Sequence, residues 1–333
     1  MRDIAADLGL STMTVSRALR SHPDTSEETR RRVLDYAEKL NFRPNRWAQS
    51  LARNKSYIVG VVVPEISHTY FAEIVMGVET VLDSAGYDLL LCHSRRDPVR
   101  ERRELDMLIE TRVDGLIIAS AEPMEAAGSF EDLEESGPPI VLIDRVFEGS
   151  SMPAVRVDDL AVGRMSAEHL IELGHRRIGY VCWGELSVSQ LRLQGFREAL
   201  DEAGIAFDDR WLIRASLSEA ECIPGVREML SARDRPTAIG TTTDPSAVGV
   251  VRAAHEAGLR VPEDLSVMGA GDIEGDRQAL PFLSTIAWST DEMGRSAASS
   301  LLSMVSEGMK RQPPSELLKP ELKARLSAGP PPK

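Results

Sequence analysis

The chain has 333 residues, of which 42% are hydrophobic and 27% are charged, a composition that excludes wholesale disorder. At about 100–200 residues per domain, this length predicts two or three domains. No apolar run approaches the roughly 18 residues that a bilayer-spanning helix needs, and the opening MRDIAADLGL lacks a secretory signal pattern. Three scattered cysteines, Cys92, Cys182 and Cys222, argue against a disulfide framework and a zinc motif. We therefore expect a reduced, cytoplasmic protein with no metal site.

Charge is divided unevenly along the chain. Residues 1–55 contain 11 Lys and Arg against 7 Asp and Glu, a net charge of +4. Because the whole chain carries −13, the remaining residues carry −17. A basic head on an acidic body is typical of a protein that binds a polyanion through its head, although a short segment can also be basic by chance.

The head, residues 1–43, predicts three short helices and no strand. An apolar face on residues 4–8 ends at Gly9, which allows a tight turn. Ser11 is a good N-cap for a second helix that runs to about Arg20, and Ser26 opens a third helix. Two short helices joined by a glycine turn predict a helix-turn-helix, whose second helix can enter a DNA major groove.

A linker follows over residues 44–56. It begins after the break at Pro44, and its segment RWAQSLAR (46–53) has the length of two helical turns. A piece this short is not a stable helix by itself.

The body, from Tyr57 onward, alternates apolar runs with amphipathic stretches, which predicts parallel α/β sheets covered by helices. About 275 residues is long for one such sheet, so we expect two α/β lobes with ligands bound at the carboxyl ends of their strands. Gly86, Gly174 and Gly258 each follow a helical pattern, as C-terminal caps do. The predicted strands are 57–63, 87–93, 115–120, 140–144, 177–183, 237–242 and 265–269, and the predicted helices lie near 71–85, 99–111, 159–173, 189–203, 217–232, 245–257 and 291–308.

Several segments of the chain resemble the LacI/GalR family of bacterial transcription regulators, in the same order from residue 1 to about Ser327. They are DIAADLGLSTMTVSRAL, SEETRRRVLDYAEKLNFRPN, VPEISHTYFAEIVMGVE, RVDGLIIAS, HLIELGHRRIGYV, RLQGFREAL and GLRVPEDLSVMG. The resemblance implies a DNA-binding head, a hinge helix, and a body similar to periplasmic sugar-binding proteins. It also implies a homodimer that binds a pseudo-palindromic operator under the control of a small sugar-like or sugar-acid metabolite, without a cofactor. On this basis the N-lobe spans about 57–157 and 288–320, and the C-lobe spans about 158–287 and 321–330.

The resemblance assigns DNA contacts to two parts of the chain. An arginine offers two parallel hydrogen bonds to guanine, whereas hydroxyl groups fix the position of a helix on phosphate. Leu51 matches a hinge leucine that wedges into a base step from the minor groove and kinks the duplex. The alternatives are a solvated helix face for Arg17 and a docked apolar helix face for Leu51. The full set of expected DNA-binding residues is Thr12, Met13, Thr14, Ser16, Arg17, Asn45, Ala48 and Leu51.

The resemblance also assigns an effector site between the lobes. A carboxylate with an arginine suits a hydroxyl-rich or acidic ligand, because charge-assisted hydrogen bonds are strong in a closed cleft. The alternative for Asp144 and Arg192 is a structural ion pair that braces the lobes. The expected effector-binding residues are Tyr70, Phe71, Asp144, Arg192, Thr243 and Asp244.

The chain departs from the family pattern at three places. Gly271 stands where many members have an acidic ligand contact, and Leu217 stands where many have an aromatic wall. Family members also carry a capped segment ahead of the first helix, so we expect the true start to lie upstream of Met1. The runs at 13–17 and 71–73 are similar to gluconate-type repressors, which favours an acidic sugar read by Arg192.

Other functions are less well supported by the sequence. The run GAGDIEG (269–275) has its third glycine one place late for a dinucleotide-binding fingerprint. His169 and His175 have no nearby cysteine to complete a metal site. No catalytic constellation supports an enzyme, and a transport protein with this body would need a signal peptide and lack the head.

Overall fold

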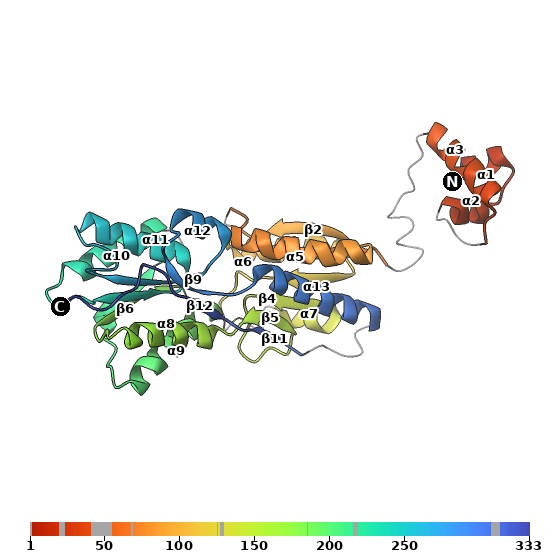
Figure 1. The fold of residues 1–333 in the computed structure, drawn as a ribbon. Helices are drawn as coiled ribbons and strands as arrows, with labels where there is room; N and C mark the ends of the chain where they lie inside the picture. Colours follow the sequence, from red (N-terminus) through yellow and green to blue (C-terminus); the bar gives the residue numbers. More distant parts are fainter. Residues whose placement is uncertain are drawn as a thin grey trace. The chain divides into compact units, whose positions relative to one another are not determined.

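The computed structural model describes residues 2–19, 24–40, 55–67, 69–124, 126, 130–184, 186–215, 219–307 and 314–333. They form two compact units, residues 1–56 and 57–333 (Figure 1). The predicted Asn45, Ala48 and Leu51 lie outside the described residues, as does Leu217. Among the described helices, none is long and apolar enough to cross a bilayer.

The head is a three-helix unit, as the sequence predicts. Gly9 adopts φ +63°, and Ser11 Oγ accepts a hydrogen bond from the Thr14 amide at 3.0 Å, so the turn and the N-cap are both confirmed. Ser26 caps the third helix by accepting from the Thr29 amide at 3.3 Å. The helices are α1 (Arg2–Leu8), α2 (Thr12–Leu19) and α3 (Glu27–Lys39).

A small apolar core holds these three helices together. One side chain from each helix, Ile4, Val15 and Val33, is at most 1% exposed. The Tyr36 hydroxyl donates to Asp7 Oδ2 at 2.8 Å, which ties α3 to α1. The three helices therefore present a fixed surface to the outside, and most of α2 apart from Val15 and Ala18 faces that surface.

The body consists of two six-stranded sheets, each covered by helices. The first sheet has the order β11-β5-β4-β3-β1-β2, in which the described strand pairs are parallel, and Val62 lies opposite both Cys92 and Ile118. We call this sheet and its helices the N-lobe. Its elements are β1 (Ile58–Val63), α5 (Thr69–Ala85), β2 (Asp88–His93), α6 (Pro98–Glu110), β3 (Gly115–Ile118), α7 (Glu131–Ser136), β4 (Ile140–Ile143), β5 (Ala154–Val157), α13 (Thr290–Glu307) and β11 (Glu316–Leu318).

The second sheet has the order β12-β10-β9-β8-β6-β7 and is parallel except for β12, which runs antiparallel to β10. We call this sheet and its helices the C-lobe. Its elements are α8 (Asp159–Glu172), β6 (Ile178–Trp183), α9 (Ser187–Glu202), the short 3₁₀ turn Asp209–Trp211, β7 (Leu212–Ala215), α10 (Glu219–Ser231), β8 (Ala238–Thr241), α11 (Asp244–Glu256), β9 (Ser266–Gly271), α12 (Glu274–Ala279), β10 (Ser284–Ala287) and β12 (Glu321–Lys323).

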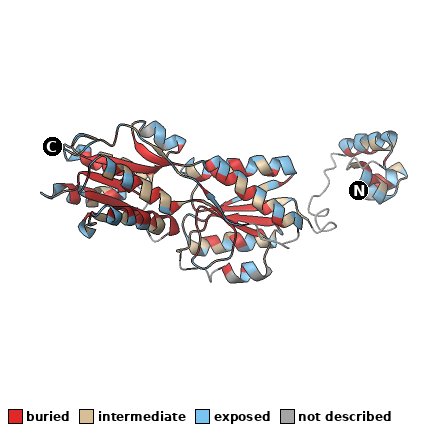
Figure 2. Ribbon diagram, turned by 60° about the horizontal axis from the view of Figure 1, so that its bottom comes forward, coloured by how far each residue is buried: buried red, intermediate tan, exposed pale blue. Residues whose placement is uncertain are grey.

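Within the described residues, the chain passes from one sheet to the other between β5 and α8, between β10 and α13, and between β11 and β12. All seven predicted strands and seven predicted helices of the body are present, and the three cap glycines have φ between +73° and +101°. The sequence missed β5, β7, β10, β11 and β12, which are only three or four residues long and carry no sustained apolar run. Figure 2 shows that the central strands of both sheets are buried, whereas β2, β7, β11 and β12 are partly exposed.

Close contact between α8 and α9 fixes the C-lobe helix that carries Arg192. A Cβ atom on Gly163 would lie 1.8 Å from the Arg192 carbonyl oxygen, and one on Gly195 would lie 2.0 Å from the Leu160 carbonyl oxygen. Only glycine at both positions allows the two backbones to approach this closely. The position of the Arg192 backbone therefore depends on two residues without side chains.

We expect Gly195→Ala to lower the free energy of unfolding by about 1–3 kcal/mol, because the new methyl group must push α8 and α9 apart. In an ordinary helix the same change would stabilise the protein by about 0.5–1 kcal/mol. Gly225→Ala in α10 is the matched control, because its Cβ would meet only the Ile213 side chain at 3.2 Å. Denaturant unfolding measures both variants, and a Gly195→Ala protein as stable as the parent would contradict this packing.

Candidate functional sites: a cavity between the lobes and a helix on the head

A cavity of about 340 Å³ lies where the carboxyl ends of strands from both sheets meet. This is the position in which open parallel sheets bind ligands. Its volume is that of a site for a small molecule. It is lined by Glu65, Ser67, Tyr70, Phe71, Arg96, Asp144, Arg145, Trp183, Val188, Arg192, Thr243, Pro245, Ala270, Gly271, Ile273 and Trp288.

The N-lobe side of the cavity contains a short hydrogen-bonded chain. Asp144 follows β4 with φ +64°, and its Oδ1 accepts from the Tyr70 hydroxyl at 2.5 Å. Trp288, after β10, donates from Nε1 to the Tyr70 hydroxyl at 3.4 Å. Burial and the negative charge of Asp144 raise the pKa of Tyr70 well above its usual range, so the phenol is a fixed neutral donor.

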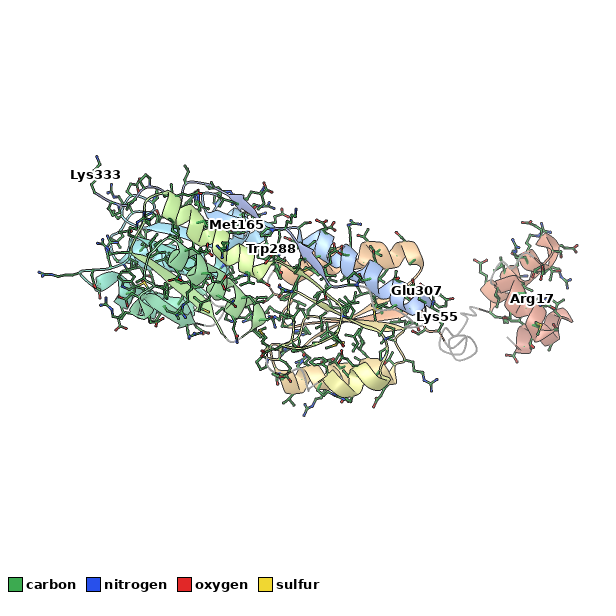
Figure 3. All side chains as sticks on the ribbon, turned by 90° about the horizontal axis from the view of Figure 1, so that it is seen from below. Arg17, Lys55, Met165, Trp288, Glu307 and Lys333 are labelled. Atoms are coloured by element: carbon green, nitrogen blue, oxygen red, sulfur yellow. The ribbon has the colours of Figure 1, made fainter. Side chains whose placement is uncertain are left out.

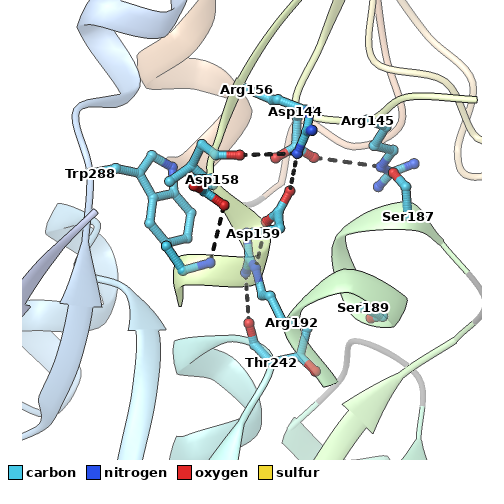
Figure 4. Close-up of polar contacts among 12 residues, drawn as sticks. Asp144, Arg145, Arg156, Asp158, Asp159, Ser187, Ser189, Arg192, Thr242 and Trp288 are labelled. Atoms are coloured by element: carbon cyan, nitrogen blue, oxygen red, sulfur yellow. Dashed lines mark hydrogen bonds and ion pairs between the residues drawn. The ribbon is translucent and has the colours of Figure 1, made fainter. Parts of the chain in front are cut away.

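The C-lobe side is anchored by a buried ion pair between Arg192 and Asp159 (Figure 4). Arg192 Nε lies 2.8 Å from Asp159 Oδ1, and its Nη1 donates to the Thr242 carbonyl at 2.7 Å. The guanidinium carbon lies 4.7 Å from the ring centre of Trp288, a cation–π contact. Burial raises the pKa of Asp159 to about 6 although Arg192 opposes the shift. Burial lowers the pKa of Arg192, but Asp159 and other acidic neighbours raise it by a larger amount, so the net shift is upward. The pair is therefore charged at neutral pH.

Two further arginines line the cavity on the N-lobe. The Arg145 guanidinium donates from Nη1 to the Ser120 carbonyl, and its Nε lies 3.6 Å from Asp144 Oδ2. Arg96, on the loop after β2, pairs through Nη2 with Glu65 Oε2 at 3.0 Å. Their guanidinium carbons lie 5.5 Å and 5.4 Å from the ring centre of Trp183 at the end of β6.

The structure brings five of the six expected effector residues together on the cavity wall: Tyr70, Phe71, Asp144, Arg192 and Thr243. The alternative of an ion pair between Asp144 and Arg192 is not observed, because Asp144 pairs with Arg145 and Arg192 pairs with Asp159.

Asp244, the sixth residue, has a different position from the expected one. It is 2% exposed and is not among the residues that line the cavity. Its Oδ1 accepts from Thr285 Oγ1 at 2.6 Å and its Oδ2 accepts from the Asp272 amide at 2.6 Å. The carboxylate therefore joins the start of α11 to β9 and β10, and an effector contact of Asp244 stays a prediction.

The sequence reasoning missed Arg96, Arg145, Trp183 and Trp288. Each follows or ends a strand at the carboxyl edge, so a systematic reading of those positions would have found them. Two indole rings line the cavity at other positions than Leu217, which lies outside the described residues.

The second site is the outer surface of α2 on the head. Thr12, Met13 and Arg17 are exposed, and Thr14 and Ser16 are half-buried. Met13 has 64% of its surface exposed, so its side chain is open to contact with a partner. Figure 3 marks Arg17 on this helix. The five predicted contact residues thus lie on a helix whose other side is packed in the head core.

A helix-turn-helix head with an exposed second helix, joined to two α/β lobes that enclose a ligand-sized cavity, defines the class of ligand-responsive DNA-binding regulators. Comparisons with known proteins agree. Residues 1–45 match the model of bacterial regulatory proteins of the lacI family, and residues 167–328 match a periplasmic binding protein-like domain. The HTH-type transcriptional repressor PurR of Haemophilus influenzae (strain PittEE) is 32% identical over 314 residues, covering 92% of this chain and 91% of PurR. The chain belongs to the LacI family and is a transcriptional repressor rather than an enzyme.

Other relatives and solved structures support the same assignment. The ribose operon repressor of Haemophilus influenzae (strain ATCC 51907 / DSM 11121 / KW20 / Rd) is 33% identical over 308 residues and covers 92% of this chain and 91% of its own. The lac repressor dimer bound to operator and the anti-inducer ONPF superposes with a TM-score of 0.88 at 28% identity, covering 98% of both chains. The CelR–cellobiose complex has a TM-score of 0.74 at 27% identity, covering 97% of this chain and 98% of CelR.

The raised pKa of Asp159 predicts a specific pH dependence of stability. Because the folded-state pKa of about 6 lies above the ordinary 3.8, the folded protein holds this proton more tightly than the unfolded chain. The stabilisation is complete below about pH 4 and is lost as the pH rises to about 6. The difference in unfolding free energy between the parent and Asp159→Asn should therefore fall by up to about 3 kcal/mol across this window and stay level above it.

Asp264→Asn provides the control for this titration. The Arg260 hydrogen bond lowers the pKa of Asp264 to about 2, so its contribution does not change between pH 4 and 6. Denaturant unfolding at a series of pH values measures all three proteins. A parent-to-Asp159→Asn difference that is constant or rises between pH 4 and 6 would show that Asp159 is not buried in the way described.

Proposed function

We propose that this repressor binds a pseudo-palindromic operator as a homodimer and that a small polar metabolite in the cavity controls its operator affinity. The observation that carries the proposal is the cavity itself, which takes polar side chains from both lobes. A ligand that contacts both lobes binds one arrangement of them better than another, and only such differential binding shifts a conformational equilibrium. The protein acts in the cytoplasm, where its operator is accessible.

The DNA contacts of the head follow from the exposed side of α2. Arg17 supplies a guanidinium group for a base edge or a phosphate. The hydroxyl groups of Thr12, Thr14 and Ser16 contact the DNA backbone or bases. Met13 supplies an apolar contact, for instance to the methyl group of a thymine. Leu51 contacts the minor groove from the hinge, Ala48 permits close approach of the two hinge helices, and Asn45 contacts the DNA beside them, a proposal that rests on the family resemblance of the sequence.

The effector is a sugar-like or sugar-acid molecule held by Tyr70, Asp144, Arg192 and Thr243. Trp183 and Trp288 offer flat apolar faces against which a ring can pack, beside guanidinium and carboxylate groups that bind its polar substituents. Cellobiose in the CelR complex shows that a protein with this fold holds a carbohydrate.

We expect Arg17→Ala to weaken binding to a specific site, selected from genomic fragments, by about 1–3 kcal/mol and to reduce the preference for it over random duplex. Arg31→Ala, which removes an equally exposed charge from α3, should weaken specific and random binding by similar factors. Gel shifts at one fixed salt concentration measure both variants. A parent protein that selects no fragment over random competitor would overturn the proposed function.

We expect Leu51→Ala to reduce the bend in the bound operator, because the alanine side chain is too short to separate a base step. The bend angle can be measured from the gel mobility of circularly permuted DNA fragments. An unchanged bend angle with normal affinity would rule out the wedge while leaving operator recognition intact.

A further inference from the structure

The hydrogen-bonding groups that face the cavity are unevenly satisfied. Both oxygens of Asp144 have a partner in Tyr70 or Arg145, and the Glu65 carboxylate is engaged by Ser67 and Arg96. The free hydrogen-bonding capacity of the charged lining residues is therefore concentrated in N–H donors of the guanidinium groups. A ligand that pairs with these N–H donors must supply hydrogen-bond acceptors.

The three arginines of the cavity differ in how well their charge is compensated. Arg192 has a direct ion pair with Asp159, a backbone acceptor and an indole face, and its pKa is raised above the ordinary value. Arg145 is only 4% exposed, yet its Nε has no hydrogen-bond partner among the described residues and lies 3.6 Å from the nearest carboxylate oxygen. Arg145 also has a backbone acceptor in Ser120 and an indole face in Trp183, so within the described part of the chain it differs from Arg192 in lacking a close carboxylate partner for its Nε.

Arg96, on the loop after β2, resembles Arg145 in having a donor without an acceptor in the part of the chain that the structure describes. Its Nε is also buried without a hydrogen-bond partner among the described residues. Burial lowers the pKa of both Arg96 and Arg145. The positive charge of Arg96 lowers the pKa of Arg145 further, whereas the negative charges of Asp144 and Glu101 raise it. The two guanidinium groups repel each other, and each keeps an Nε–H without an acceptor among the described residues, although Arg96 pairs with Glu65 and Arg145 donates to the Ser120 carbonyl.

Backbone conformation fixes both arginines in place. Arg95 and Arg96 have φ values of +55° and +60°, and Asp144, which precedes Arg145, has +64°. Residues other than glycine adopt this left-handed region at a cost, and such strain concentrates at functional sites. Glu101 holds Arg145 in place through Ser120. The Glu101 carboxylate accepts from the Ser120 hydroxyl, and the Ser120 carbonyl accepts from Arg145.

We infer that the effector carries a carboxylate or phosphate group and that Arg96 and Arg145, whose guanidinium carbons lie 5.4 Å and 5.5 Å from the Trp183 ring centre, bind this group. An anion placed there relieves the repulsion between the two guanidinium groups and supplies the missing acceptors, and planar guanidinium groups bind such oxygens in pairs. The inference rests on the proposed effector cavity and names its ligand class. It moves the anion-binding role from Arg192, where the sequence indicated it, to the N-lobe wall.

Calorimetry on the full-length chain with matched probes tests this inference. The probes are D-glucose, D-gluconate and D-glucose 6-phosphate, and D-ribose, D-ribonate and D-ribose 5-phosphate. Within at least one series, a carboxylate or phosphate probe should bind at least about tenfold more tightly than the neutral sugar. The carboxylate and phosphate members of each series show which anion the site accepts.

Arg145→Gln and Arg96→Gln should each weaken binding of the preferred anion about tenfold or more and change binding of the neutral sugar less than about threefold. Arg260→Gln is the matched control, because its side chain is 71% exposed and pairs with Asp264. Arg96 is about one-third exposed, so its variant gives an answer even if the Arg145 variant fails to fold.

Three results would overturn the inference: neutral sugars that bind as tightly as the anions, an anion preference that survives both substitutions, or no binding of any anionic probe at about 10 mM. Binding of the parent protein to its selected DNA fragment is measured alongside. Loss of the anion preference with operator binding intact refutes only this inference, whereas failure to select DNA refutes the proposed function.

Discussion

Burying charged side chains away from water carries a large desolvation free energy in this structure, and the cavity depends on the contacts that offset it. Asp144, Arg145, Asp159 and Arg192 are each no more than 6% exposed. The penalty for a buried ion is several kcal/mol, and removing one partner of a buried pair costs about 3–5 kcal/mol. Asp159 and Arg192 compensate each other within the C-lobe, while Asp144 contacts Tyr70 and Arg145 within the N-lobe. Arg156 Nη1, in β5 of the N-lobe, lies 3.6 Å from Asp159 Oδ2, so the charged groups of the two lobes are linked.

This arrangement explains how a ligand can act on two lobes together. The carboxyl ends of both parallel sheets meet at the cavity, and Trp288, in the segment between β10 and α13, contacts Tyr70 of one lobe and Arg192 of the other. Figure 4 shows Trp288 beside Arg192 and Asp159. A bound ligand that completes the polar contacts of both walls stabilises one lobe arrangement. The head joins the same chain ahead of β1, which leads directly into the helix that carries Tyr70.

The long elements of the fold could be predicted from the sequence because apolar runs, helical periodicity and cap glycines are local signals. The short strands could not, since their few residues are ordered by neighbours distant in sequence. At the site, the positions of Tyr70, Phe71, Asp144, Arg192 and Thr243 on the cavity wall follow from strand ends and family resemblance. The ion-pair partners did not follow, because the direction of each side chain depends on the tertiary fold. Asp244 shows the same limit: it follows a strand, yet Thr285 and the Asp272 amide hold its carboxylate inside the C-lobe.

The central claim is that occupancy of the cavity and operator binding are coupled. Thermodynamic linkage requires such coupling to be reciprocal, with a free energy on the order of 1–3 kcal/mol. The most direct test measures the dissociation constant of an effector with the full-length protein free and saturated with operator. The two constants should differ by the same factor by which that effector changes the operator affinity. Equal effector affinity in the free and operator-bound protein would contradict it.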